Sequence, residues 1–121
     1  MRVVISVFAQ QQIRETAKYI LGKFGKKSKD TFIQKVKETS KLLEANPYLG
    51  PEEPLLANMV TTYHSVVISH LNKMIYRILD DRIEVSDLWD CRREPNEQAK
   101  ETLTRNQEGF SAVKSSTKPN K

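Results

Sequence analysis

The sequence predicts an α+β fold in which a helical hairpin packs on a small, mostly antiparallel sheet. Three observations carry this prediction. A run of β-branched residues opens the 121-residue chain, two helical patterns with a short link follow it, and three strand-like runs come after a proline-containing loop. The predicted order is therefore strand, helix, helix, strand, strand, strand (β-α-α-β-β-β), with a polar C-terminal extension.

The first strand is predicted at residues 2–8, where β-branched and aromatic residues are concentrated. Almost no polar residue interrupts this run. A strand that is apolar on both faces is typical of the interior of a sheet. We therefore expect this strand in the middle of the sheet, paired with the strands that come later in the chain.

Two helices are predicted next, because the hydrophobic period changes at Gln10. The first apolar stripe consists of Ile13, Ala17, Ile20, Leu21 and Phe24, and Gly25 is a suitable helix end. The second stripe consists of Phe32, Ile33, Val36, Ser40 and Leu43, and it ends at Asn46-Pro47. Residues 26–29 form the expected link, with Ser28 or Asp30 as the cap of the second helix. Such a short link predicts an antiparallel hairpin.

The second half of the chain predicts a loop, three strands and a weak helix. Residues 46–58 contain three prolines and form the loop. The strand-like runs are residues 63–69, 73–79 and 83–89, whose three-residue links favour an antiparallel meander that also accepts the first strand. Residues 96–107 are polar apart from Ala99 and Leu103, so we expect a helix that needs a partner to become ordered. Residues 108–121 are expected to form a disordered basic tail.

Composition excludes several classes of protein. No stretch of about 18 apolar residues is present, so no transmembrane helix and no membrane partner are expected. The start of the chain does not have the pattern of a secretory signal. Cys91 is the only cysteine, which excludes an internal disulfide and suits a cytoplasmic location.

Charge is distributed unevenly along the chain. The net charge is +5, but residues 1–43 alone contain ten Lys or Arg and three acidic residues, a net of +7. This excess predicts either an acidic partner or simply a lysine-rich solvated helix face.

Basic residues near the last two strands are the main candidates for a functional site. They are Lys73, Arg77, Arg92 and Arg93. Arginine makes planar contacts with phosphate or carboxylate groups. The alternative is ion pairing with acidic residues close in sequence, which are Asp80, Asp87, Asp90 and Glu94. Ion pairing is slightly favoured for Arg77 and less for Arg92 and Arg93, because two consecutive side chains cannot point the same way.

Other reactive residue types give no complete site. His64 and His70 have no third metal ligand placed with them, so no metal is expected. Cys91 has no adjacent histidine and is interpreted as a passive thiol. No glycine-rich phosphate loop occurs, so no cofactor and no small-molecule substrate are expected.

The aromatic residues are mostly interpreted as packing residues. Trp89, Tyr63 and Tyr76 lie in predicted strands, where core packing is favoured over a stacking platform for bases. Tyr19 and Tyr48 suit either a partner surface or local packing.

An ordered set of motifs makes residues 1–98 resemble the RelE/ParE superfamily of bacterial toxins from type II toxin–antitoxin modules of the plasmid-stabilisation type. The motifs are the helix end Phe24-Gly25, the turn Asn46-Pro47-x-x-Gly50, the strand segments Tyr63–Val67 and Lys73–Ile78, and the ending Trp89-Asp90-Cys91-Arg92-Arg93-Glu94-Pro95. The resemblance implies a toxin domain at residues 1–98, followed at residues 99–121 by the weak helix and the basic tail.

The resemblance implies one of two activities. RelE-like members cleave messenger RNA on the ribosome, using basic residues and a Tyr or His near the C-terminus, whereas ParE-like members inhibit DNA gyrase without chemistry of their own. Lys73 and Arg92 fall near two of the basic positions, but no Tyr or His follows Arg93. Cleavage needs groups that give and take protons. We therefore expect a ParE-like, non-enzymatic toxin, with the ribonuclease and a non-toxic antitoxin-binding remnant as alternatives.

The resemblance also implies a protein partner. A small acidic antitoxin would neutralise the toxin, and the basic helical hairpin is the expected landing surface. DNA gyrase or the ribosome would be the target.

Overall fold

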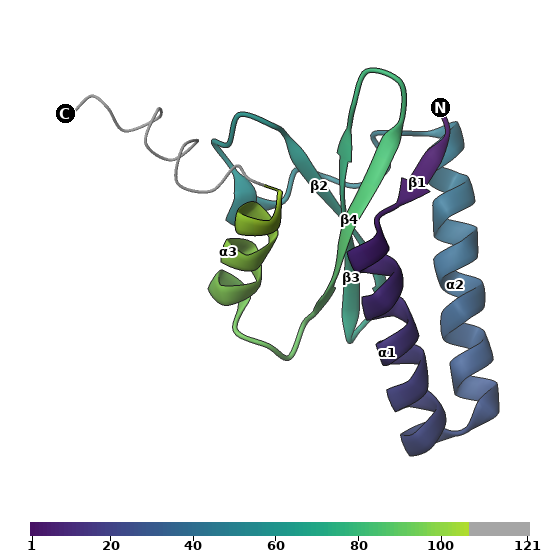
Figure 1. The fold of residues 1–121 in the computed structure, drawn as a ribbon. Coiled ribbons are helices and arrows are strands. Elements are labelled where there is room, and N and C mark those ends of the chain that lie inside the picture. The colour runs from purple at the N-terminus through teal and green to yellow at the C-terminus, as the bar shows by residue number, and fades with distance from the viewer. Residues whose placement is uncertain (107–121) are drawn as a thin grey trace.

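The computed structural model describes residues 1–106, and it has the predicted order of elements (Figure 1). In chain order these are β1 (Val3–Ile5), α1 (Val7–Phe24), α2 (Lys26–Ala45), the short 3-10 helix η1 (Pro54–Leu56), β2 (Tyr63–Ser69), β3 (Asn72–Ile78), β4 (Ile83–Asp90) and α3 (Pro95–Arg105). The α+β class and the hairpin on a small sheet are therefore confirmed.

The sheet has the strand order β1-β4-β3-β2. Strands β2, β3 and β4 form the predicted antiparallel meander. Strand β1 runs parallel to β4, with Val3 opposite Ile83 and Ile5 opposite Val85. The sheet is thus mixed, with two antiparallel pairings and one parallel pairing.

The predicted length and central position of the first strand are wrong. Strand β1 spans only Val3–Ile5 and lies at an edge of the sheet. The Ser6 side chain accepts a hydrogen bond from the Ala9 N–H and caps α1, so Val7 and Phe8 belong to the helix. The apolar residues of β1 are instead half-buried against the core beneath the hairpin.

The two long helices are joined by one residue, Gly25, whose φ of 95° is accessible to glycine at little cost. The predicted link at residues 26–29 is wrong, because α2 already begins at Lys26 and has no side-chain cap. Asp30 instead forms ion pairs with Lys26 and Lys29. The predicted antiparallel hairpin is confirmed.

The hairpin covers one face of the sheet and encloses the larger core (Figure 1). Its buried residues include Ile20, Phe32, Val36, Leu43, Met74, Tyr76 and Val85. Two members of the predicted first stripe are exceptions. Leu21 is 45% exposed and Phe24 is 56% exposed.

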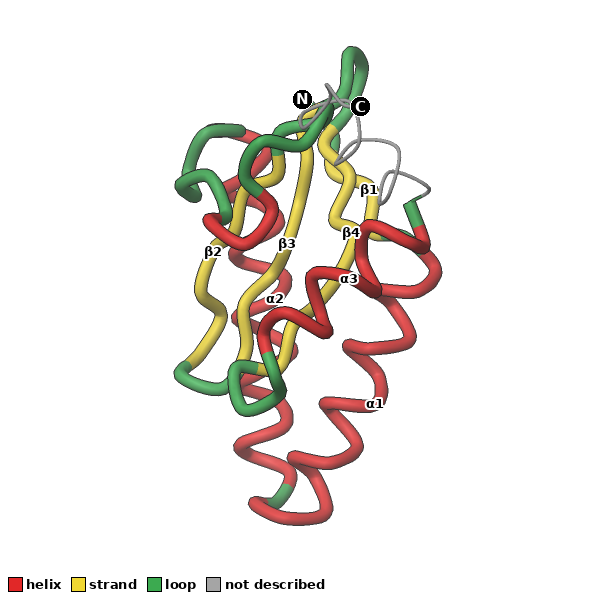
Figure 2. The backbone as a smooth tube through the Cα atoms, turned by 90° about the vertical axis from the view of Figure 1, so that its left-hand side faces the viewer, coloured by secondary structure: helices red, strands yellow, loops and turns green. Residues whose placement is uncertain are grey.

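The opposite face of the sheet is covered by α3 and η1, so the molecule has three layers (Figures 1 and 2). A second core contains Leu56, Tyr63, Ile75, Trp89, Ala99 and Leu103. The weak C-terminal helix therefore packs on the sheet of its own chain, and the predicted division at residue 98 falls within α3. The tail predicted at residues 108–121 lies outside the described residues.

The loop between α2 and β2 is fastened to the sheet around Gly50. The Tyr76 hydroxyl donates to the Pro47 carbonyl at 2.8 Å and accepts from the Gly50 N–H at 2.9 Å. A Cβ atom at Gly50 would lie 2.1 Å from the Ser65 carbonyl oxygen. Only glycine allows the loop to approach β2 this closely.

Candidate functional site

Lys73 lies on the face of β3 that α3 partly covers. Its Nζ lies 2.5 Å from Oε1 of Glu53 and 5.2 Å from the centre of the Trp89 ring. The Glu53 side chain is 1% exposed and also accepts a hydrogen bond from the Leu55 N–H, which caps η1. Burial raises the pKa of Glu53, but hydrogen bonds from Lys73, Leu55 and Ser65 lower the pKa by more than burial raises it. The pKa of Glu53 is therefore below its ordinary value.

Arg77 follows Lys73 on the same face of β3. The register of β3 and β4 places it opposite Glu84, and its Nε donates to Glu84 Oε1 at 2.8 Å. Its guanidinium also lies 5.9 Å from the centre of the Tyr63 ring. Ion pairing is therefore confirmed for Arg77, although the partner is none of the acidic residues suggested by closeness in sequence.

Arg92 and Arg93 diverge, as expected for consecutive residues. Arg92 holds Asp90 through Nε and Nη2, both at 3.0 Å. These bonds lower the pKa of Asp90 and raise that of Arg92. Arg93 reaches the other way, to Glu101 of α3 at 2.9 Å.

Tyr19 is a neighbour of Arg92 that the sequence does not indicate. Its hydroxyl accepts a hydrogen bond from Arg92 Nη1 at 3.3 Å, and the guanidinium lies 5.1 Å from the centre of its ring. Both residues line a groove of about 280 Å³, together with Glu15, Asn72 and Asp90. The sequence has no Tyr or His after Arg93, but in the structure a tyrosine hydroxyl reaches Arg92 from α1, 73 residues away in sequence.

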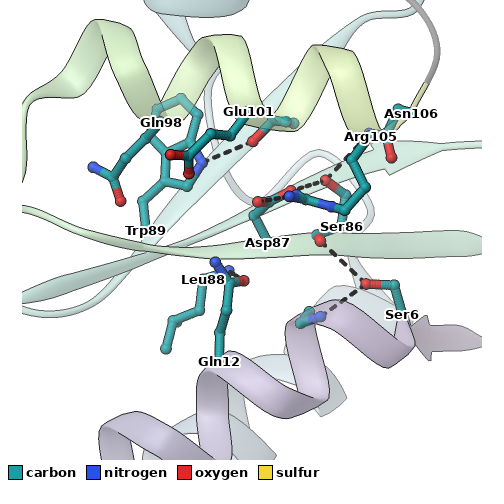
Figure 3. Close-up of polar contacts among 12 residues, drawn as sticks. Ser6, Gln12, Ser86, Asp87, Leu88, Trp89, Gln98, Glu101, Arg105 and Asn106 are labelled. Atoms are coloured by element: carbon teal, nitrogen blue, oxygen red, sulfur yellow. Dashed lines mark hydrogen bonds and ion pairs between the residues drawn. The ribbon is translucent and has the colours of Figure 1, made fainter.

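A second missed residue, Arg105, links α3 to β4 (Figure 3) and also contacts α1. From the end of α3, it forms an ion pair with Asp87 of β4, and its guanidinium lies 3.6 Å from the centre of the Phe8 ring of α1. Asp87 is 3% exposed, and burial raises its pKa. The Ser86 hydroxyl also donates to Asp87, at 2.5 Å.

The histidines and Cys91 give no metal site in the described part of the chain. His64 is buried, with Nδ1 2.9 Å from the Gly50 carbonyl and its ring stacked on Tyr76. His70 lies in the turn between β2 and β3, and Cys91 is exposed. Within residues 1–106, no three side chains of His, Cys, Asp or Glu come together as a metal site would require.

The aromatic residues are distributed largely as predicted. Trp89, Tyr63 and Tyr76 are at most 2% exposed, so their packing role is confirmed. The Trp89 indole N–H donates to the Thr102 hydroxyl at 3.0 Å. Tyr48 is 71% exposed.

The structure therefore does not bring the four basic candidates into one site. Lys73 and Arg77 share the covered face of the sheet, whereas Arg92 and Arg93 follow the end of β4 and both line the groove beside Tyr19. Each of the four faces a carboxylate, so much of its positive charge is already balanced.

Among residues 1–106, no helix combines the length and apolar character needed to cross a membrane.

Solved structures of bacterial toxins have similar folds. A YoeB dimer from Staphylococcus aureus aligns at a TM-score of 0.50 and 22% identity, covering 72% of this chain and 92% of that one. A YoeB/ParE toxin from Agrobacterium tumefaciens aligns at a TM-score of 0.52 and 19% identity, covering 74% and 98%. A heterotetrameric YoeB-YefM toxin-antitoxin complex from S. aureus aligns at a TM-score of 0.46 and 23% identity, covering 72% and 92%.

The fold is thus that of the YoeB and ParE class of toxins. No curated protein matches the chain in sequence. Residues 3–95 match the family described as "ParE toxin of type II toxin-antitoxin system, parDE". The chain belongs to this family of toxins.

Proposed function

We propose that this toxin acts in the cytoplasm by binding a macromolecular target, with DNA gyrase as the first candidate, and that a cognate antitoxin neutralises it. The observation that carries the proposal is the pairing of Lys73, Arg77, Arg92 and Arg93 with carboxylates. A phosphate in a cleavage reaction requires cations that are aimed at its developing charge. Basic side chains that already form ion pairs with carboxylates are better suited to stabilising a surface that binds a macromolecular target.

Purified gyrase provides the test of this function. We expect the toxin to inhibit supercoiling of relaxed plasmid or to cause cleaved gyrase–DNA complexes to accumulate. Messages translated in the presence of the toxin should stay intact. Unchanged supercoiling and unchanged cleavage at saturating toxin would remove gyrase as the target.

Ribosome-dependent cleavage of messenger RNA is the second candidate, and the Tyr19–Arg92 contact favours it. A hydroxyl and a guanidinium at one groove are able to supply proton transfer and charge stabilisation together. If this function is correct, primer extension will detect cuts in translated messages. Tyr19→Phe should then lower the rate about a hundredfold, whereas Tyr48→Phe, which alters an exposed tyrosine elsewhere, should not.

Expression of this chain without an antitoxin distinguishes a non-toxic remnant, which would only bind an antitoxin, from both candidate functions. Arrested growth supports a toxin with a target. Normal growth at an expression level verified by immunoblot would indicate the remnant instead.

A further inference from the structure

A hollow of about 750 Å³ lies between the loop that precedes β2 and the turn between β3 and β4. Figures 1 and 2 show this turn at the opposite end of the molecule from the turn between α1 and α2. The loop contributes Glu52 and Val60 to the walls of the hollow, and the turn contributes Leu79 and Asp80. The hollow shares no residue with the groove beside Tyr19, so it is a separate feature of the surface.

Two carboxylates at this hollow have no counter-charge. Within residues 1–106, Glu52 and Asp80 form no ion pair, whereas Asp81 is paired with Arg82 at 2.8 Å. Residues 44–72 contain three glutamates and no lysine or arginine. Although the chain has a net charge of +5, the lining of the hollow is therefore negative, and it favours a basic ligand.

The buried ring of His64 adds a hydrogen-bond acceptor to the hollow. His64 is 7% exposed and borders the hollow. Its Nδ1 lies 2.9 Å from the Gly50 carbonyl oxygen, so in the neutral ring Nδ1 carries the hydrogen and Nε2 has the lone pair. Among residues 1–106, no group donates to Nε2. Buried acceptors are normally hydrogen-bonded, which indicates that a ligand at the hollow supplies the donor.

We propose that this hollow receives an arginine side chain from a basic surface of the protein target. The inference rests on the proposed function, because that function supplies a target that handles nucleic acid and neutralises phosphates with basic side chains. The planar guanidinium has five N–H donors, so it is able to pair with Glu52 or Asp80 while it donates to Nε2 of His64. Its weakly hydrated faces pack against the apolar walls that Val60 and Leu79 provide.

Other ligands fit the hollow less well. Nucleic acid would bring phosphates close to carboxylates that lack a counter-charge. The same repulsion acts on an acidic antitoxin, so this surface is distinct from the basic hairpin. A lysine ammonium has fewer donors and is more strongly hydrated than a guanidinium. A metal ion would require three ligands, and no such group of side chains comes together in residues 1–106.

Titration of nitrogen-15-labelled toxin with N-acetylargininamide, followed by NMR, tests the hollow directly. We expect saturable shifts of the amide signals of Thr62, His64 and Asp80, with a Kd on the order of millimolar for a single side chain. The nitrogen-15 signal of His64 Nε2 should shift as this atom accepts a hydrogen bond. N-acetyllysinamide should bind more weakly, and N-acetylglutaminamide, which has no charge, should leave these signals in place.

Removal of the two carboxylates provides the decisive variant. Glu52→Gln combined with Asp80→Asn should raise the Kd for N-acetylargininamide about tenfold or more, because the guanidinium loses its charged acceptors. Glu38→Gln combined with Glu97→Gln is the matched control, since it removes the same charge from exposed residues of α2 and α3. All four side chains are exposed, so both double variants should retain the unfolding midpoint of the wild type.

Two results of this titration would overturn the proposal. One is a set of small shifts spread over the whole surface, without saturation at the hollow. The other is an equal Kd for the wild type and for the variant that lacks the carboxylates of Glu52 and Asp80.

The gyrase assay then connects the hollow with the target. If the wild type affects gyrase, the loss of the Glu52 and Asp80 carboxylates should raise the toxin concentration for a half-maximal effect about tenfold, whereas the control variant should match the wild type. Equal potency of the two double variants would overturn the assignment of the hollow to the target. If the wild type leaves gyrase unchanged, the proposed target is wrong, and the arginine titration still decides whether the hollow binds a guanidinium.

Discussion

The Lys73–Glu53 pair shows how burial determines the importance of an ionic contact. Glu53 is almost completely enclosed, whereas Lys73 remains 26% exposed. Charge removed from water is costly unless a partner and additional hydrogen bonds compensate for it. Glu53 has both, because it receives hydrogen bonds from Lys73, the Leu55 N–H and Ser65. The pair consequently fixes η1 and its loop against β3.

Lys73→Met should lower the free energy of unfolding by about 3 kcal/mol, since it leaves Glu53 buried without its counter-charge. Adding Glu53→Gln to the same chain should recover a large part of this loss, because the amide needs no counter-ion. Urea unfolding of the two single variants and the double variant completes the cycle. Additive effects would mean that the two side chains are not energetically coupled.

Acid should destabilise the toxin partly through Glu53. Its pKa in the folded state is below its ordinary value of 4.5, so the stability it provides is present above that pH. This contribution is lost as the pH falls through the folded-state value. Urea unfolding at a series of pH values should therefore show a shallower acid decline for Glu53→Gln than for the wild type. Parallel declines would contradict the assigned origin of the shift.

Gly50 and Gly22 form a natural pair for comparison. Gly50→Ala should cost about 2 kcal/mol of stability, because its Cβ would clash with the Ser65 carbonyl and force the loop away from β2. Gly22→Ala meets no atom within 4 Å and should stabilise α1 by about 0.5–1 kcal/mol. Thermal unfolding measures both effects. A neutral Gly50→Ala would show that the loop moves without cost.

At the residue scale, placement in predicted strands was enough to predict the packing roles of Trp89, Tyr63 and Tyr76. The same reasoning could not find Tyr19 beside Arg92. That contact depends on how far α1 extends past the end of β4, and no local pattern encodes this distance. Arg105 was missed for a related reason, since its partners Asp87 and Phe8 belong to two other elements.

At the scale of elements, α3 has few apolar residues but a well-defined position. Ala99 and Leu103 contact the second core, and Thr102 accepts the Trp89 N–H. Polar residues that find partners on the sheet thus contribute to holding a helix whose composition predicted only weak order. Its 11 residues are too few to form a stable helix alone, so its order depends on this contact.

Leu103→Ala should lower the free energy of unfolding by about 2 kcal/mol through the cavity it leaves. It should also make Trp89, the only tryptophan, more accessible to acrylamide in fluorescence quenching, because α3 covers it. Leu42→Ala is the matched control, since Leu42 is 55% exposed on α2 and its replacement should change stability by less than about 0.5 kcal/mol. Equal acrylamide quenching of Trp89 in the wild type, Leu103→Ala and Leu42→Ala would contradict the conclusion that α3 covers Trp89.

The hairpin and the meander were predictable because their periods and links are local features. The length of β1 was not, because the strand ends at the Ser6 cap, in a run where apolar residues continue on both sides of this serine. Its edge position also escaped prediction. The hairpin half-covers β1, and this burial explains apolar residues that would otherwise suggest a central strand.

At the scale of the whole molecule, charge should govern how fast the partner arrives. The net charge of +7 on residues 1–43 creates a long-range attraction for an acidic protein, which salt screens over about 10 Å at 0.1 M. Stopped-flow measurements should therefore show an association rate that falls as sodium chloride is added, while the dissociation rate changes little. An association rate independent of salt would indicate an interface dominated by apolar contacts.

The parallel pairing of β1 with β4 has a consequence during synthesis. The first strand leaves the ribosome about 80 residues before its neighbour Ile83–Val85 does, which at ordinary rates of translation is a delay of several seconds or more. Throughout that interval the nascent hairpin has no completed platform to cover. The hairpin is therefore synthesised before the sheet that it covers, because β1 cannot pair with β4 until residues 83–85 have been made.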